Sequence, residues 1–402
     1  MPATVTIVGG GNSAHVLIPF LHESGHVVNL MTRRPESWSE TVTCELQCGV
    51  TANVMKHHEG KIHKKSSDPA EVIPDADVVV LCMPVHQYRH ALMRLGPHIN
   101  RSKKEVFVGT IYGQAGFNWM VHEMERENKL TNVVAFAVGL IPWICRAIEY
   151  GSKVANYGGK QLNVVAVSPF DKFERLNKIF LEDISLKPLN IGKFTQACSF
   201  ISLTLSVDNQ IIHPSRCYGL WKTDGGWWPS LEDVPYFYRD FDDLSAENIR
   251  RLDDDYSAVR DAVRKRFPER SFKYMLSYLD LERLAHTSQN FDIKQSLKDS
   301  KQLALIKTPT VEREDGSREL DIHCRFFTDD IAYGLLVAKW LAEELDVETP
   351  FIDEVIMWAQ NLRGEKFLTE GGKINKDFCL KEKFISGIPP SYGISSVDGI
   401  LD

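Results

Sequence analysis

The segment TVTIVGGGNSAH at residues 4–15 restricts what this chain can fold into more than any other. Residues 4–8 are all β-branched, which is typical of a buried parallel strand. Three glycines follow, and the helical pattern behind them stops at Gly25. A second apolar strand pattern starts at Val27. A strand, a glycine turn, a helix and a strand within about 30 residues predict a unit that binds a dinucleotide.

The small residues of this loop fit a G-x-G-x-x-A pattern, and each has a physical role in it. Gly9 permits the tight turn out of the strand. Gly11 has no Cβ, so the backbone can approach a pyrophosphate, and Ala14 lets the helix pack closely on the strand. Asn12 lies in the same loop, and the N-terminus of the helix that follows offers free N–H groups and a positive dipole end to an anion.

The end of the second strand bears on the choice of cofactor. Many NAD sites carry an acidic residue there, which binds the ribose 2′-hydroxyl. This chain has Thr32, Arg33 and Arg34 at that place and no acid. The two arginines could meet the 2′-phosphate of NADP, or they could stack on adenine or face water. Both NAD and NADP therefore stay open.

Further strand patterns alternate with helical ones, which predicts a doubly wound sheet of the Rossmann type. Ligands bind at the carboxyl ends of the strands in such sheets. Met83 and Pro84 stand at one of these ends, and Gln114 follows another. The strand patterns cover residues 76–84, 105–117, 132–143 and 162–169.

The strand signals fade after about residue 195. Residues 244–267 are charged and amphipathic, with apolar residues at helical spacing, and further helical patterns follow. We therefore expect an α/β protein whose domain of residues 1–193 is the dinucleotide-binding sheet. Residues 194–402 should form a mainly α-helical domain, with the site in the cleft between the two.

His213 is the histidine most suited to acid–base chemistry, because it closes an apolar run and precedes Pro214. Proline disfavours helix for the residue before it, so we expect a helix break there. A polar side chain at such a break in an apolar region can serve as an acid–base group. The alternative is a hydrogen-bonded histidine of the core.

Arg325 and Asp330 form a second set of candidates. Thr328 fits an N-cap, which would place Asp330 in the first turn of a helix. Acidic residues favour that position because of the helix dipole, so a purely structural role is the alternative. Arg325 lies just upstream, where it could pair with an acid.

Charge and composition exclude several classes of function. The net charge is −7, which gives no electrostatic basis for nucleic acid or membrane binding. The basic run at residues 56–65 lacks aromatic residues and is interpreted as a solvated loop. The eight cysteines have no metal spacing, so we expect thiols and no metal. With no secretory signal pattern, these features favour a cytoplasmic protein.

Eight segments together resemble the opine dehydrogenase family, such as the octopine, tauropine and alanopine dehydrogenases of marine invertebrates. Their order and spacing match along nearly the entire chain. The GQAGF and IMWAQ sequences are more specific than the glycine loop. The segments are GGGNSAH (9–15), ADVVVLCMP (76–84), GQAGF (113–117), PWICR (142–146), IIHP (211–214), RFFTDDIAYG (325–334), IMWAQNLRGEKFL (356–368) and SYGISSVDGIL (391–401).

The resemblance implies an oxidoreductase acting on CH–NH donors with NAD or NADP. Such enzymes condense an α-keto acid, commonly pyruvate, with the amino group of an amino acid and reduce the imine. By position, His213 would be the acid–base residue, Asp330 would orient it and Arg325 would bind a substrate carboxylate. Gln114 would lie in the turn that contacts the keto acid, and Cys145 near the amine.

Two positions depart from the arginine-using members of the family. This chain has Tyr274 and Asn209 where they place tryptophan and tyrosine, so a smaller amine such as alanine, glycine or taurine is implied. Two rival functions remain: a ketone reductase of the same two-domain plan and a non-enzymatic sensor of the NAD(P) redox state. We expect small-molecule substrates and a monomer or homodimer. The amine donor and the physiological direction are left open.

Overall fold

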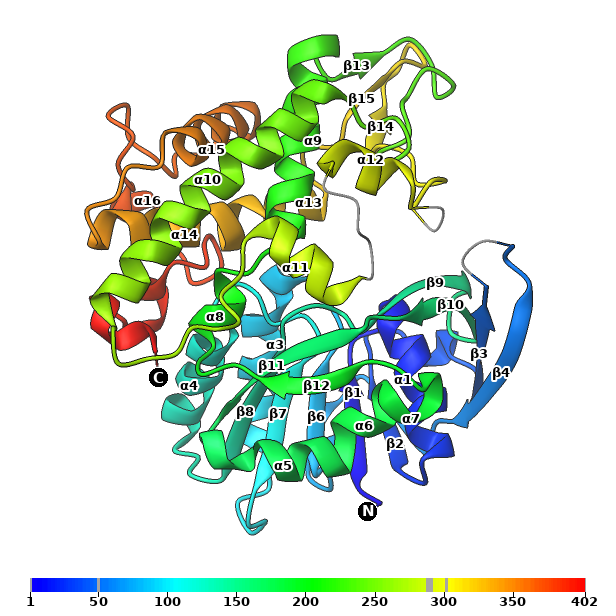
Figure 1. Ribbon diagram of the computed structural model, residues 1–402. Helices are drawn as coiled ribbons and strands as arrows, with labels where there is room; N and C mark the ends of the chain where they lie inside the picture. The colour runs from blue at the N-terminus through cyan, green and yellow to red at the C-terminus, as the bar shows by residue number, and fades with distance from the viewer. Residues whose placement is uncertain (1, 49–50, 287–291, 301–302, 402) are drawn as a thin grey trace.

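The computed structural model describes residues 2–48, 51–286, 292–300 and 303–401, which form two lobes (Figure 1). Within these residues, eight strands make the sheet of the N-terminal lobe. Its strands are parallel except where β11 pairs with β8. The order across the sheet is β12 (Lys193–Gln196), β11 (Leu162–Ser168), β8 (Val133–Val138), β7 (Val106–Thr110), β6 (Val78–Leu81), β1 (Thr4–Val8), β2 (Val27–Met31) and β5 (Lys64–Ser66).

A four-stranded second sheet covers the helix that follows the glycine loop. This helix, α1 (Asn12–Glu23), is buried from Ser13 to Leu21 because its neighbours on both sides are apolar. The order in the second sheet is β4 (Val54–Lys61), β3 (Thr41–Gln47), β10 (Lys153–Gly159) and β9 (Trp143–Glu149). The hairpin of β9 and β10 thereby lies beside the glycine loop.

The sequence pattern predicts a solvated loop for the basic run at residues 56–65, but this prediction is wrong. Most of it belongs to β4 and β5, although the strand β4 is largely exposed. His58 is buried against Phe20 of α1, and Gly60 lies so close to Pro19 that a Cβ would come within 2.5 Å of its Cα. His58 and Gly60 are alternate positions of β4, and both pack against α1. This packing outweighs the polar composition of the strand.

The C-terminal lobe is mainly helical, as expected. The predicted helix at residues 244–267 is α10, whose apolar stripe is completely buried. A small sheet of β13 (Trp227–Trp228), β15 (Arg318–Leu320) and β14 (Thr310–Glu312) lies at its far end (Figure 1). The helices are α8 (Ile201–Thr204), α9 (Asn209–Asp224), α10 (Asp243–Arg266), α11 (Tyr278–Ala285), α12 (Ile293–Lys298), α13 (Arg325–Thr328), α14 (Leu336–Glu344), α15 (Pro350–Arg363) and α16 (Lys376–Cys379).

The first sheet extends beyond the boundary expected at residue 193. Strand β12 pairs in parallel with β11 up to Gln196, so the helical lobe follows residue 196. No described helix is long and apolar enough to cross a membrane.

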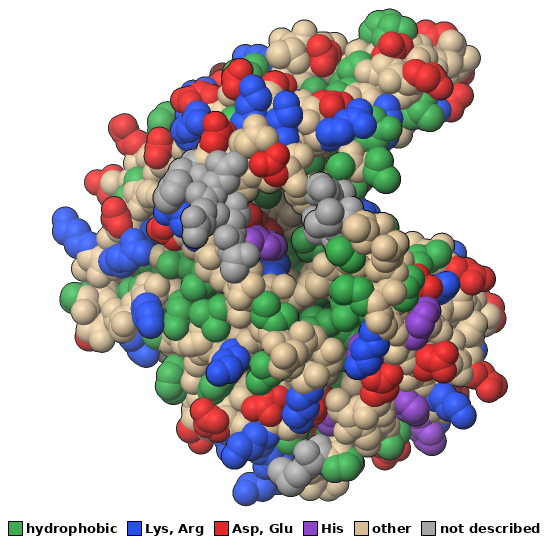
Figure 2. Space-filling view, turned by 45° about the vertical axis from the view of Figure 1, so that its right-hand side comes forward, with side chains coloured by type: hydrophobic (Ala, Val, Ile, Leu, Met, Phe, Trp, Pro, Cys, Tyr) green, Lys and Arg blue, Asp and Glu red, His purple; other side chains and the backbone are tan. Residues whose placement is uncertain are grey.

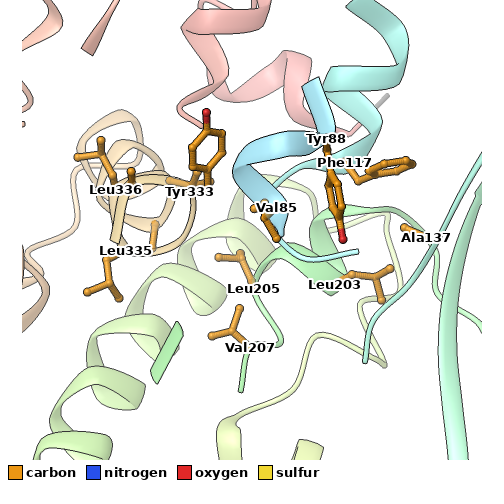
Figure 3. Close-up of a cluster of buried hydrophobic side chains, with 14 of the residues drawn as sticks. Val85, Tyr88, Phe117, Ala137, Leu203, Leu205, Val207, Tyr333, Leu335 and Leu336 are labelled. Carbon is orange, nitrogen blue, oxygen red and sulfur yellow. The ribbon is translucent and has the colours of Figure 1, made fainter. Parts of the chain in front are cut away.

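One apolar cluster joins the two lobes, and Figure 3 shows its centre. Val85 and Phe117 come from the N-terminal lobe, whereas Leu205 and Leu335 come from the helical lobe, and all four are buried. The core is therefore continuous across the lobe boundary.

The end of the chain returns to the N-terminal lobe. Buried Arg89 of α3 (Tyr88–Leu95) binds both oxygens of Glu123 in α4 (Phe117–Asn128), each at 2.6 Å. The same guanidinium donates to the carbonyl of Ser391 at 2.6 Å. Trp119 also donates its indole N–H to the carbonyl of Ile400 at 3.2 Å. These bonds fasten the C-terminal segment to the dinucleotide-binding lobe.

Candidate active site

His213 and Asp330 meet inside the helical lobe, although 117 residues separate them in sequence. His213 Nδ1 lies 2.7 Å from Asp330 Oδ2, and neither residue is more than 3% exposed. His213 Nε2 lies 3.2 Å from the hydroxyl of Tyr238. The imidazole stacks on Phe326 with 3.7 Å between ring centroids. Because Nδ1 is bound to the carboxylate and one ring face is covered, the imidazole has a fixed orientation.

The local structure around both residues differs from the sequence expectation. His213 is not at a helix break, because α9 continues through Pro214. The missing N–H of proline is tolerated where the rest of the helix is buried in the core. Thr328 is not an N-cap either: α13 already begins at Arg325, and Asp330 precedes a π-helical turn at Ile331–Leu335. Such turns are frequent at functional sites.

Burial determines the protonation of the pair. It lowers the pKa of His213 well below its usual value, and the positive charge of Arg325 acts in the same direction. Burial also raises the pKa of Asp330, although Arg325 opposes that shift. Burial raises the pKa of Tyr238 to about 12, so its hydroxyl stays neutral. In the unliganded protein burial thus favours the uncharged imidazole and opposes ionisation of Asp330.

Arg325 is the positively charged residue that shifts the pKa values of both His213 and Asp330. Its side chain is exposed to solvent yet surrounded by protein groups, as expected for a residue that lines a cleft. Burial disfavours its charge, but Asp330, Tyr238 and Tyr112 outweigh burial and raise the pKa of Arg325. The space-filling view shows the surface hollowed between the two lobes (Figure 2). A guanidinium in this setting can bind a carboxylate through two parallel hydrogen bonds.

Gln114 lies at this site but is fully buried, with both ends of its amide engaged. Its Nε2 donates to the carbonyl of Ser206 at 3.2 Å and to Asp208 Oδ1 at 3.3 Å. Its Oε1 accepts from the hydroxyl of Tyr112 at 2.9 Å. The side chain therefore holds the GQAGF turn against the start of α9. Its expected contact with the keto acid stays a prediction.

Asn209 and Tyr274 lie in the helical lobe, as expected. Asn209 is the half-buried first residue of α9 and lies beside the Tyr112 hydroxyl. Tyr274 accepts a hydrogen bond from Thr195 at 3.0 Å. It also lines a small pocket with Leu140 and Leu281. His213 and Arg325 are not among the lining residues of that pocket.

Cys145 lies on β9, next to Ser13 of the glycine loop. Burial raises the pKa of its thiol to about 12, so it is protonated at neutral pH. This position is next to the cofactor loop. Its expected place near the amine is untested.

The glycine loop has the form expected of a dinucleotide site. Gly9 has a φ of +110°, and a Cβ there would lie 2.4 Å from the carbonyl oxygen of Cys82. A Cβ on Gly11 would lie 3.2 Å from the same oxygen. Ala14 is buried against the first strand. The loop thus leaves bare backbone at the start of α1, and these residues fit a pyrophosphate.

The other expected cofactor residues surround this loop. Asn12 accepts a hydrogen bond from the N–H of Ala147 at 3.1 Å. Thr32 Oγ1 lies near Gly10, whereas Arg33 and Arg34 are exposed. Met83 and Pro84 follow β6 at the same edge of the sheet.

The sequence comparisons cover the two lobes separately. The family described as NAD/NADP octopine/nopaline dehydrogenase, alpha-helical domain, matches residues 196–363. The family described as NADP oxidoreductase coenzyme F420-dependent matches residues 4–111. An opine dehydrogenase from Haliotis discus hannai is 27% identical over 427 residues, covering 99% of this chain and 98% of the relative. Over nearly its whole length the chain is thus similar to opine dehydrogenases.

Other opine dehydrogenases match over the same length. A tauropine dehydrogenase from Arabella iricolor is 25% identical over 416 residues, which cover 99% of both chains. The structure of an octopine dehydrogenase in complex with NADH and agmatine has a TM-score of 0.80 at 22% identity. That alignment covers 99% of this chain and 98% of the other, and it shows the shared fold. This opine dehydrogenase homologue is an NAD(P)-dependent oxidoreductase.

Sequence reasoning missed the contacts that three residues make at the site. Tyr238 stands in an aromatic run and has no motif around it. Asp208 joins Gln114 to α9, and Asp329 accepts a hydrogen bond from the N–H of Val85 at 2.9 Å. Of these three residues, only Asp329 had a signal in the sequence, because it stands next to Asp330.

Proposed function

We propose that this enzyme condenses an α-keto acid, pyruvate first among them, with the amino group of an amino acid, and catalyses the reverse oxidation. One observation carries the proposal: the buried His213–Asp330 pair lies within electrostatic reach of Arg325. An acid–base group beside a carboxylate-binding cation suits an α-keto acid and its imine.

Arg325 binds the keto-acid carboxylate in this proposal. Its planar guanidinium matches the two carboxylate oxygens and so fixes which face of the carbonyl is presented. The incoming negative charge also cancels the field that disfavours imidazolium at His213. Binding of the keto acid therefore raises the pKa of His213, and Nε2 takes up a proton at the moment when the reaction needs an acid.

His213 Nε2 is the nitrogen that exchanges protons with the substrate, since Nδ1 is bound to Asp330. Addition of the amine to the carbonyl gives a carbinolamine, and a proton from Nε2 lets its hydroxyl leave as water. The protonated imine then accepts a hydride, which is the chemistry that the nicotinamide supplies when bound. In the oxidative direction the neutral imidazole removes the proton from the secondary amine.

The amine proposed here is small. This choice rests on the family resemblance at Tyr274 and Asn209, with alanine, glycine and taurine as the candidates. We further propose a cytoplasmic location and a monomer or homodimer. Buried thiols such as Cys82 and Cys217 are in no disulfide, which suits a reducing compartment.

Cofactor oxidation tests the proposal directly. NADH and NADPH consumption is followed first with pyruvate alone and then with a panel of amino acids added. Little turnover with pyruvate alone and strong acceleration by one amine is the expected result. Equal rates with and without every amine would favour the ketone-reductase function, and no turnover with any keto acid would favour the redox sensor.

A further inference from the structure

The turn between β9 and β10 is bonded directly to the glycine loop. Asn12 Oδ1 accepts from the N–H of Ala147 at 3.1 Å, and His15 Nε2 accepts from the N–H of Gly151 at 2.7 Å. Two hydrogen bonds from the start of α1 thus reach the β9–β10 hairpin, which belongs to the second sheet.

His15 is a neutral imidazole of defined tautomer in this arrangement. Nε2 accepts from Gly151, so the ring proton is on Nδ1 and donates to the carbonyl of Gly11 at 2.9 Å. The ring is fully buried and packs against Trp38 at a tilt of 32°, with 4.2 Å between centroids. Burial lowers the pKa of His15, although the bond to Gly11 acts against it. The same side chain therefore holds both the glycine loop and the hairpin turn.

The turn carries Tyr150, which is restrained by its neighbours. Its ring meets the edges of Trp38 and His15, with centroids 5.6 Å and 5.5 Å away. The guanidinium of Arg34 lies over it, 4.9 Å from its centroid. A Cβ built on Gly10 would lie only 2.6 Å from the Tyr150 hydroxyl. Among the described residues this hydroxyl has no hydrogen-bond partner.

We propose that the β9–β10 turn forms one wall of the dinucleotide site, with Tyr150 contacting the adenosine half of the cofactor and His15 positioning the turn. A restrained aromatic ring with a free hydroxyl beside bare loop backbone can donate to a ribose or phosphate oxygen. Thr32 also lies at Gly10, at the end of β2 where the adenosine ribose lies in such folds.

The proposal assigns different tasks to the two arginines. Arg34 is engaged with the ring of Tyr150, so its role is to restrain that ring. Arg33 is exposed and remains available for a 2′-phosphate.

Binding of NADH and of ADP-ribose to the full chain, without substrates, tests the contact by calorimetry. This measurement does not depend on the proposed amine reaction. Tyr150→Phe should weaken both ligands roughly 3- to 10-fold, as expected for the loss of one hydrogen bond, and Tyr150→Ala should weaken them further. The control is Tyr157→Phe, which removes a hydroxyl from β10 of the same hairpin and should change neither. Unchanged affinity in both Tyr150 variants would overturn the contact.

A double-mutant cycle tests the positioning role of His15. His15→Asn should weaken ADP-ribose binding, and this loss should be much smaller in the Tyr150→Ala background, because the turn then carries no contact to position. If His15 had a purely structural role, its substitution would cause the same loss of affinity in both backgrounds. That result would overturn the positioning role. Thermal unfolding of each variant shows that folded protein is compared, and His15→Gln replaces His15→Asn if the latter does not fold.

Discussion

Asp329 joins the helical lobe to the N-terminal lobe through Val85, whose backbone N–H lies 2.9 Å from its Oδ2. The next residue in the chain, Asp330, holds the imidazole of His213. Two consecutive carboxylates thus point to different partners. One fixes the position of the segment against the end of β6, and the other orients the acid–base group.

Asp329→Ala should lower the free energy of unfolding by about 1–3 kcal/mol, because the buried N–H of Val85 loses its acceptor. Chemical denaturation measures this change. The exposed ion pair of Arg250 and Glu247 on α10 provides a control. Glu247→Ala should change the free energy of unfolding by less than about 1 kcal/mol. Equal effects of the two variants would contradict the docking role.

His213→Ala should lower kcat by about 10²- to 10⁴-fold, the usual contribution of a positioned acid–base group. Cofactor affinity should stay nearly unchanged, because the glycine loop belongs to the other lobe. Steady-state kinetics and NADH binding are measured on the same folded preparation. A variant with near-normal kcat would make His213 an ordinary residue of the core.

Asp330→Asn should slow turnover and shift the pH profile. Reductive turnover needs protonated His213, so the rate falls as pH rises through the pKa of that residue. Removing the negative neighbour disfavours imidazolium and lowers the pKa of His213 further, so the fall should move to lower pH. The pH dependence of kcat/KM reports the free enzyme. A shift toward higher pH would show that Asp330 does not support the charged imidazole.

Arg325→Gln should shift the fall of the reductive rate to higher pH, opposite to the shift expected for Asp330→Asn. The guanidinium lowers the pKa of His213, so its removal raises that pKa and extends reductive activity to higher pH. Arg325→Lys keeps the charge but not the paired hydrogen bonds, so it should act mainly on the KM for pyruvate. An unchanged pyruvate KM in both variants would mean that the carboxylate binds elsewhere.

Arg33→Ala should weaken NADPH binding selectively if this arginine meets the 2′-phosphate. A charge-assisted hydrogen bond contributes about 1.5–3 kcal/mol, or roughly tenfold to a hundredfold in affinity. Arg34→Ala should instead affect NADH and NADPH alike, because Arg34 lies over Tyr150. Equal loss of both cofactors in the Arg33 variant would exclude a role in reading that phosphate.

The parts of the fold with a local signal were predicted from the sequence. The βαβ unit around Gly9 and Gly11 is confirmed because its strand, turn and helix are adjacent in the chain. The helix at residues 244–267 is confirmed because a single apolar stripe specifies it. The sheet edge at β12 was missed, since a strand of four residues, three of them with polar side chains, carries little strand signal.

The candidate site depends on contacts that no local pattern encodes. His213 meets Asp330 only after α9 packs against the segment that follows α13. Local rules also failed there: Pro214 did not interrupt α9, and Thr328 did not start a helix. Tertiary packing outweighed both propensities. The roles proposed for these residues came from family resemblance, and the spacing of residue types alone left them open.

The apolar cluster shared by the two lobes bears on how new specificities can arise in this family. Val85 and Phe117 on one side fit Leu205 and Leu335 on the other, so a helical lobe taken from a relative would meet mismatched neighbours. Each overpacked or cavity-forming mismatch costs about 1–3 kcal/mol, against a total stability of about 5–15 kcal/mol. A chimera of two members should therefore fold poorly unless the apolar residues between its two lobes are redesigned to fit. Evolution toward another amine is accordingly expected to proceed by single substitutions within one inherited scaffold, and engineers who redesign this enzyme face the same constraint.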